Sequence, residues 1–154
     1  MEEYTLTEVI EYARVLEENA KKYYLESLKV VELPNAKEFL NELVKEEEKH
    51  IELLDNLRNK IERGKAVPLV KEKVKPLGYA DFVADVQLDE HSGYKEILMV
   101  GMKREQEAIE TYEKFSRYTD DPDAIALFSF LANEERKHLR RFEAAYDDLL
   151  DAPY

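Results

Sequence analysis

Two short stretches of the sequence place a histidine three residues after a glutamate. They are Glu47-x-x-His50 and Glu135-x-x-His138. Residues three positions apart share one face of a helix, so each stretch would present a carboxylate and an imidazole side by side. This mixture of ligands suits iron or manganese, and zinc also accepts it. Both stretches are therefore candidate metal-binding half-sites.

Each stretch has an upstream glutamate that suits the same site. Glu17 and Glu105 lie in the apolar stripes of their own helical segments, as the two motif glutamates do in theirs. Four buried carboxylates that face one another need counter-charge. Lys49 and Lys137 cannot provide it, because they follow the motif glutamates by two positions and point elsewhere. Two divalent cations would balance the four charges, so the sequence predicts a two-metal centre.

The two halves of the chain are related by an internal repeat with an offset of 88 positions. The offset pairs all six candidate ligands: Glu17 with Glu105, Glu47 with Glu135, and His50 with His138. It also pairs Ala20 with Ala108, Tyr24 with Tyr112, Pro34 with Pro122, and Leu43 with Leu131. The chain has three histidines, so the histidine match is hard to ascribe to chance. The repeat predicts two half-sites, one from each half of the chain.

Helical periodicity identifies the elements that would position these residues. We expect four helices, at about 5–28, 35–63, 94–118 and 122–150. Capping-box spacing occurs at Thr5 with Glu8 and at Asn35 with Glu38. The inner faces comprise Val9, Ala13, Leu16, Ala20 and Tyr24, then Leu40, Leu43, Val44, Ile51 and Leu54, then Leu98, Gly101, Met102, Ala108, Ile109 and Tyr112, and last Leu127, Phe128, Leu131, Leu139, Phe142 and Tyr146.

The connections between these segments indicate the topology. Short links at 31–34 and 119–121 make antiparallel neighbours of the helices that they join. The stretch 64–93 is long and contains Pro68 and Pro76, which favours a crossover between two helical hairpins. A short helix at about 79–87 is left open. The predicted fold is all-α, an antiparallel four-helix bundle in one domain over 1–154, with 64–93 as the crossover.

Composition excludes several classes of protein. A formal net charge of −12 argues against non-specific nucleic-acid binding, which needs clustered Lys and Arg. The absence of cysteine excludes disulfides, zinc ribbons, cysteine-ligated iron–sulfur centres and a fused rubredoxin-type carrier. No stretch reaches the roughly 18 apolar residues of a membrane span, and the N-terminus lacks the pattern of a secretory signal. We expect a cytoplasmic protein without membrane contacts.

Tyrosines near the motifs are candidates for a supporting role. Tyr24 and Tyr112 follow Glu17 and Glu105 by seven residues, on the same helix faces. Core packing with a satisfied hydroxyl is one reading; a catalytic or redox role beside the metal ligands is the other. The same two readings apply to Tyr23.

Other residues near the motifs are expected to be ordinary. Glu46, Glu48 and Glu134 lie off the inner stripes and are predicted to be surface charges. His91 falls outside the repeat, where a solvated loop histidine is expected, and Met102 is expected in the core.

The motifs together resemble the rubrerythrin-like branch of the ferritin-like superfamily over nearly the whole chain. The residues that carry the resemblance are Glu17-x-x-Ala20-x-x-Tyr23-Tyr24, Glu47-x-x-His50, Glu105-x-x-Ala108-Ile109-x-x-Tyr112 and Glu135-x-x-His138. It implies a ferritin-like bundle, a homodimer, and two iron ions (Fe2+/Fe3+) at the six ligands. It also implies reduction of hydrogen peroxide or O2 as protection against oxidative stress.

Two departures from the rubrerythrin pattern qualify these expectations. Rubrerythrins draw electrons from a rubredoxin-like domain, and this chain has no cysteine to build one. A separate electron-donor protein, such as rubredoxin, is then expected. Rubrerythrins also tend to carry an additional Glu three residues after the third-helix ligand. Ala108 occupies that position here, which puts the redox-linked ligand switch attributed to that Glu in doubt.

Other readings of the same ligand set stay open. Bacterioferritin shares the six ligands, so a ferroxidase that prepares iron for storage is the main alternative. Its haem ligand is a Met directly after the second-helix Glu; Glu48 stands there, and no haem is expected. A third reading is a non-enzymatic bundle that metals only stabilise, or that binds a partner. An oxygenase acting on an organic substrate would use the same ligands.

Overall fold

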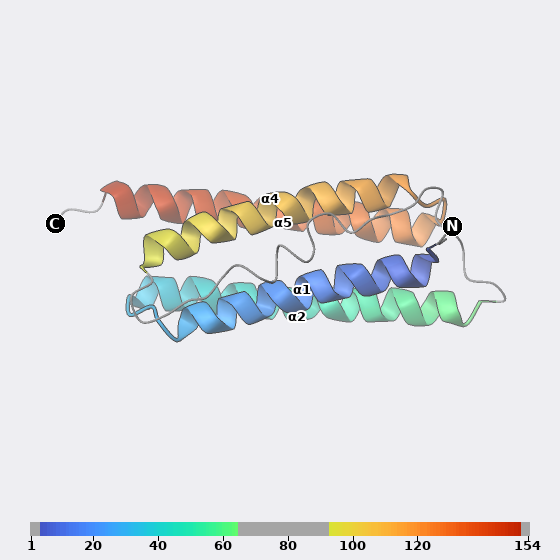
Figure 1. Ribbon diagram of the computed structural model, residues 1–154, viewed down its shortest axis with the longest axis horizontal. Helices are drawn as coiled ribbons and strands as arrows, with labels where there is room; N and C mark the ends of the chain where they lie inside the picture. Colours follow the sequence, from blue (N-terminus) through green and yellow to red (C-terminus); the bar gives the residue numbers. More distant parts are fainter. Residues whose placement is uncertain (1–3, 65–92, 152–154) are drawn as a thin grey trace.

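The computed structural model describes residues 4–64 and 93–151, and these form four helices. Helix α1 spans Leu6–Leu28, α2 Pro34–Glu62, α4 Tyr94–Arg117 and α5 Pro122–Asp151. In Figure 1, α1 and α2 make one antiparallel hairpin, α4 and α5 make a second, and the two hairpins lie along one another. The predicted all-α, antiparallel four-helix bundle is confirmed, with helix ends within one or two residues of those expected.

The direction of the helices fits the predicted topology. Figure 1 shows α2 and α4 running the same way along the bundle, so the last turn of α2 and the first turn of α4 are at opposite ends. Consecutive helices arranged in this way need a long connection rather than a short turn. The predicted crossover at 64–93 and helix at 79–87 lie outside the described residues except for Gly64 and Gly93, and His91 lies outside them as well.

Local chemistry explains where the helices begin. The hydroxyl of Thr5 accepts a hydrogen bond from the backbone N–H of Glu8 at 3.2 Å, as an N-cap should. The capping box predicted at Asn35 is wrong. Helix α2 begins at Pro34 with no side-chain cap, because proline has no N–H to leave unsatisfied in the first turn. Helix α5 has a cap that was not predicted: Asp121 Oδ2 accepts from the N–H of Ala124 at 2.9 Å.

The buried apolar residues form two clusters, one towards each end of the bundle. One contains Leu6, Leu54, Tyr112 and Phe128, and the other Tyr24, Leu40, Leu98 and Phe142, each with further neighbours. Most members of the predicted inner stripes lie in these clusters, and Ile51, Gly101 and Ile109 are buried outside them. Five residues of the predicted stripes are only half-buried: Ala20, Met102, Leu127, Leu139 and Tyr146. The six candidate ligands belong to neither cluster, although all are buried.

Among the helices that the structure describes, none joins the length and apolar character that crossing a lipid bilayer demands.

Candidate metal centre

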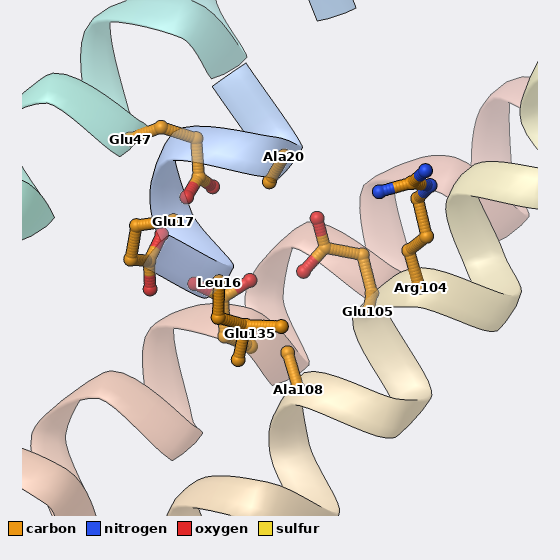
Figure 2. A pocket seen from close by; sticks show the side chains of 8 residues that line it. All are labelled: Leu16, Glu17, Ala20, Glu47, Arg104, Glu105, Ala108 and Glu135. Atoms are coloured by element: carbon orange, nitrogen blue, oxygen red, sulfur yellow. The ribbon is translucent and has the colours of Figure 1, made fainter. Parts of the chain in front are cut away.

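Each of the four helices contributes one buried carboxylate to the middle of the bundle. Glu17, Glu47, Glu105 and Glu135 come from α1, α2, α4 and α5, and none is more than 2% exposed. Figure 2 shows the four carboxylates pointing toward one another. Because each glutamate interrupts the apolar stripe of its helix, the packing that buries the stripe also buries the carboxylate. The structure brings together the four glutamates that the repeat selects.

The two motif histidines join the glutamates through the same ring nitrogen. Nδ1 of His50 lies 3.1 Å from an oxygen of Glu135, 3.4 Å from Glu17 and 3.8 Å from Glu47. The two rings stack with their centroids 5.6 Å apart and their planes 13° from parallel. Both histidines are buried, with exposed fractions of 4% and 1%.

Nδ1 of His138 mirrors that arrangement on the other side of the centre. It lies 3.3 Å from Glu47, 3.4 Å from Glu135 and 3.7 Å from Glu105. The donor atoms therefore form two groups, each within 4.8 Å: Glu17, Glu47, His50 and Glu135, and Glu47, Glu105, Glu135 and His138. Each group combines an upstream glutamate and a histidine of its own with two shared glutamates.

The shared glutamates, Glu47 and Glu135, direct one oxygen to each group. Oε2 of Glu47 faces His50 and Oε1 faces His138, whereas Oε1 of Glu135 faces His50 and Oε2 faces His138. A carboxylate that offers one oxygen to each of two neighbouring positions has the geometry of a bridge between two metal ions. The sequence sets Glu47 and Glu135 apart as the glutamates of the two Glu-x-x-His stretches, but spacing alone does not show that each would offer one oxygen to each metal position.

Several of the converging atoms lack a hydrogen-bond partner. They include both oxygens of Glu47, Oε2 of Glu105, Oε1 of Glu135 and Nδ1 of His138. Buried polar atoms are rarely left in this state, because each unsatisfied group costs about 1–3 kcal/mol. Metal ions would use these lone pairs, and carboxylate with imidazole is the donor set of iron and manganese sites. The residues are consistent with a centre of two iron ions.

Without metal, protons have to offset the charge. Burial disfavours a charged ring at His50, but Glu17 and Glu135 outweigh it and raise the pKa of His50 to about 10. His138 behaves in the same way: burial disfavours its charged ring, but the close carboxylates of Glu105, Glu135 and Glu46 hold its pKa far above the usual value. Burial together with Glu135 raises the pKa of Glu105 to about 8. Metal ions would have to displace these protons in order to bind.

Two tyrosines donate to the upstream glutamates across the bundle. The hydroxyl of Tyr112 on α4 donates to Oε1 of Glu17 at 2.5 Å, and that of Tyr24 on α1 donates to Oε1 of Glu105. Burial and the nearby carboxylates raise the pKa of both tyrosines well above 10, so the hydroxyls keep their protons. Both tyrosines are fully buried with a bonded hydroxyl, as the core-packing reading expects, and their partners are two of the candidate ligands; a catalytic or redox role stays a prediction. The hydroxyl of Tyr23 instead donates to the carbonyl of Ile97 at 2.8 Å.

Glu46 is not the plain surface charge that the sequence predicts. Its Oε2 lies 2.6 Å from Nε2 of His138, and its side chain is 35% exposed. The contact with His138 and the neighbouring Arg141 lower the pKa of Glu46 despite its partial burial. The prediction failed because Glu46 is one position before Glu47, at the edge of the inner face, where it still reaches the histidine. Glu48 contacts Lys21, is 53% exposed and fits the predicted surface role, whereas Glu134 contacts Lys137 but is only 22% exposed.

A small pocket opens beside the carboxylates. Its volume is about 10 Å³, roughly the room that one water molecule needs. Figure 2 shows the side chains that line it: the four glutamates with Leu16, Ala20, Arg104 and Ala108. Ala20 and Ala108 follow Glu17 and Glu105 by three residues, and their short side chains leave space next to the carboxylates.

Arg104 is a residue of this pocket that sequence reasoning missed. It is 9% exposed, and its guanidinium lies over the ring of Tyr23, 4.6 Å from the centroid. Burial lowers the pKa of Arg104. The repeat could have indicated that Arg104 faces the interior, because the offset of 88 pairs it with Leu16, a member of the predicted inner stripe.

Solved structures of similar fold cover almost the whole chain. A hypothetical protein from Pyrococcus furiosus is 28% identical, with a TM-score of 0.73, over 98% of this chain and 94% of that one. The bacterioferritin-related protein of Bacteroides fragilis, described as a dodecameric thioferritin, is 20% identical, with a TM-score of 0.71, over 94% and 86%. CopM in its Cu(I)-bound form is 14% identical, with a TM-score of 0.65, over 95% and 98%. These likenesses confirm the ferritin-like bundle.

The comparison by family is more specific than the comparison of folds. No curated protein matches the chain. The family model described as Rubrerythrin matches residues 8–146, a range that contains all six candidate ligands. The match confirms the resemblance drawn from the motifs, and the chain belongs to the rubrerythrin family.

Proposed function

We propose that this protein is a di-iron oxidoreductase that reduces hydrogen peroxide or O2. The observation that carries the proposal is the pair of shared glutamates, Glu47 and Glu135, each with one oxygen toward each histidine. Two ferrous ions bound there would supply together the two electrons that, with two protons, convert hydrogen peroxide into two molecules of water. Family membership supports the same chemistry.

The chain's own residues provide the surroundings that such a reaction needs. Glu47 and Glu135 each direct one oxygen to each of the two positions, so these positions are neighbours. Ala20 and Ala108 leave the pocket open beside the carboxylates. The apolar clusters on either side keep bulk water from the ligands. Tyr24 and Tyr112 hold a proton on each hydroxyl next to Glu105 and Glu17.

The reducing electrons have to come from another molecule. The chain has no cysteine with which to build a rubredoxin-type centre. We therefore include in the proposal a separate electron-donor protein, with rubredoxin as the first to test.

Rapid mixing tests the proposed reaction. Protein loaded with Fe2+ without oxygen is mixed with hydrogen peroxide or with O2, and oxidation of the iron is followed by absorbance. We expect peroxide to oxidise the protein much faster than O2, with repeated turnover once a reductant is added. Glu47→Gln should abolish the fast reaction, whereas Glu48→Gln, a change at the adjacent exposed residue, should preserve it. A slow or single-turnover reaction with peroxide contradicts the proposal.

Ferroxidation for iron storage is the second candidate function. The similar fold of a protein described as a dodecameric thioferritin favours its consideration. Storage requires a hollow shell of many subunits, so the size of the native protein separates the two functions. A dimer or tetramer supports the oxidoreductase. A shell of twelve or more subunits that takes up iron far beyond two ions per chain supports storage.

A further inference from the structure

The two histidines differ in what their Nε2 atoms contact. Nε2 of His138, the nitrogen that faces away from the shared glutamates, is 2.6 Å from Oε2 of Glu46. This is a close ion-pair contact rather than a hydrogen bond of regular geometry. Among residues 4–64 and 93–151, His50 has no counterpart to it. In the part of the chain that the structure describes, carboxylates within 4.0 Å reach His50 only at Nδ1.

The difference arises where the internal repeat breaks down. The offset of 88 pairs Glu46 with Glu134, but Glu134 contacts Lys137 on its own helix at 3.1 Å. Glu46 is instead held by Arg141 of α5, whose Nη1 donates to its two oxygens at 3.1 and 3.3 Å. The repeat pairs Arg141 with Leu53, which has no charge to offer Glu134.

Arg141 is itself well anchored. Its Nη2 donates to Glu42, and its guanidinium lies over the ring of Phe39, 5.4 Å from the centroid. Three residues of α2, Phe39, Glu42 and Glu46, therefore hold the Arg141 side chain in place. The same contacts fix the position of the Glu46 carboxylate. The arrangement keeps the Glu46 carboxylate against His138.

A carboxylate in this position alters a histidine ligand. A ring that binds a metal through Nδ1 carries its proton on Nε2, where a carboxylate can accept it. Such a partner fixes the ring orientation and makes the imidazole a stronger ligand. Removing a partner of this kind typically weakens metal binding by about 10–100-fold.

We propose that Glu46, held by Arg141, makes the two metal positions unequal, so that the position with Glu105 and His138 binds its ion first and more tightly. The position with Glu17 and His50 fills second. Glu46 acts through His138 and is a positioning residue. The inference rests on the proposed function, because it requires the same two-metal centre.

Titration with 57Fe2+ without oxygen tests the inference, with binding followed by calorimetry and by Mössbauer spectroscopy. The parent protein should show two steps, and the first ion should occupy one spectroscopic environment. Glu46→Gln should weaken the tighter step by about 10-fold, and the first ion should then divide between two environments. Glu134→Gln, the same change at the position that the repeat pairs with Glu46, should alter neither step.

Further variants separate this role from a merely structural one. Arg141→Leu, which copies Leu53, should weaken the tighter step by less than Glu46→Gln does. His138→Ala should abolish the tighter step, and His50→Ala should retain it. An ordinary ion pair between α2 and α5 would change the thermal stability of the metal-free protein but not the difference between the steps.

Two results overturn the inference while the proposed function stands. One is a parent protein that binds two ions with equal affinity in one environment. The other is a Glu46→Gln variant that binds iron as the Glu134→Gln variant does. A parent protein that binds no iron overturns the inference and the proposed function together.

Discussion

Tyr112 on α4 donates its hydroxyl proton to Oε1 of Glu17 on α1, across 2.5 Å between the two hairpins. Tyr24 on α1 donates in the opposite direction, to Glu105 on α4. Each upstream glutamate is thus oriented by a tyrosine of the other hairpin. One carboxylate oxygen is engaged by the hydroxyl, which leaves the other to serve as a ligand.

Loss of the Tyr112 hydroxyl should weaken one metal position. In Tyr112→Phe the carboxylate of Glu17 loses its orienting donor, and we expect affinity at the Glu17 and His50 position to fall by about 10-fold. The free energy of unfolding should fall by about 1–3 kcal/mol, because an oxygen of Glu17 stays buried without a partner. Metal titration and chemical denaturation measure the two effects.

Tyr118→Phe is the matched control for this change, since Tyr118 packs against the same cluster without a contact to the ligands. Its metal affinity should match that of the parent protein. Equal affinities in all three proteins would show that the Tyr112 hydroxyl does not position Glu17.

Substitutions of Glu47 and of Glu17 should differ in how many metal ions they affect. Glu47 belongs to both donor groups and Glu17 to one. We therefore expect Glu47→Gln to weaken the binding of both ions, and Glu17→Gln to weaken one and spare the other. The number of metal ions retained per chain after gel filtration measures the difference. If Glu17→Gln loses both ions and Glu47→Gln loses one, the assignment of the bridging residues is wrong.

The sequence predicted the helices and the ligand set because both follow from periodicity. Val9, Leu43 and Phe128 lie on the apolar stripes that define the helices, and their burial follows from the pattern. The glutamates that interrupt those stripes are buried for the same reason. The offset of 88 then predicted which glutamates belong to corresponding helices.

The parts that were missed depend on contacts between helices, which periodicity does not contain. Glu46 approaches His138 because α2 and α5 pack at one particular rotation, in which Arg141 also reaches it. The same holds for Arg104, whose place over Tyr23 depends on how α1 and α4 meet. At Pro34 a backbone effect prevailed over the side-chain cap predicted at Asn35.

The metal-free protein should lose stability as the pH rises. The pKa of His50 is about 10 in the folded chain against 6.5 ordinarily, and that of Glu105 is about 8 against 4.5. Between the unfolded and the folded pKa of each group, the folded chain holds more protons than the unfolded chain. The free energy of unfolding therefore falls as the pH rises from about 5 to about 10. Metal ions replace the protons, so the loaded protein should not show this fall.

Two measurements check the pH dependence. Thermal unfolding midpoints across this pH range should decline for the metal-free protein alone. Metal uptake in weakly buffered solution near neutral pH should release protons, and the affinity should increase with pH. Metal-free protein that gains stability as the pH rises, or uptake without proton release, would contradict the assigned protonation.

Gly101 should not tolerate a larger side chain. A Cβ there would lie 2.7 Å from Cζ of Phe142 and closer still to Cε1. We expect Gly101→Ala to destabilise the bundle by about 1–3 kcal/mol through overpacking. The other hairpin has Ala13 and Leu54 at the corresponding positions. The double variant with Phe142→Leu should therefore lose less than the sum of the single changes, as denaturant unfolding can determine. If the two losses of unfolding free energy simply add, the methyl group added at position 101 does not clash with Phe142.

The number of iron ions bound per chain tests the two-metal centre most directly. Protein stripped of metal is titrated with Fe2+ without oxygen, and bound iron is counted in the parent and in a variant that carries both Glu47→Gln and Glu135→Gln. The arrangement of the six ligands predicts two ions per chain in the parent and none held tightly in the variant. A parent that binds fewer than two, or a variant that binds as many as the parent, would contradict it.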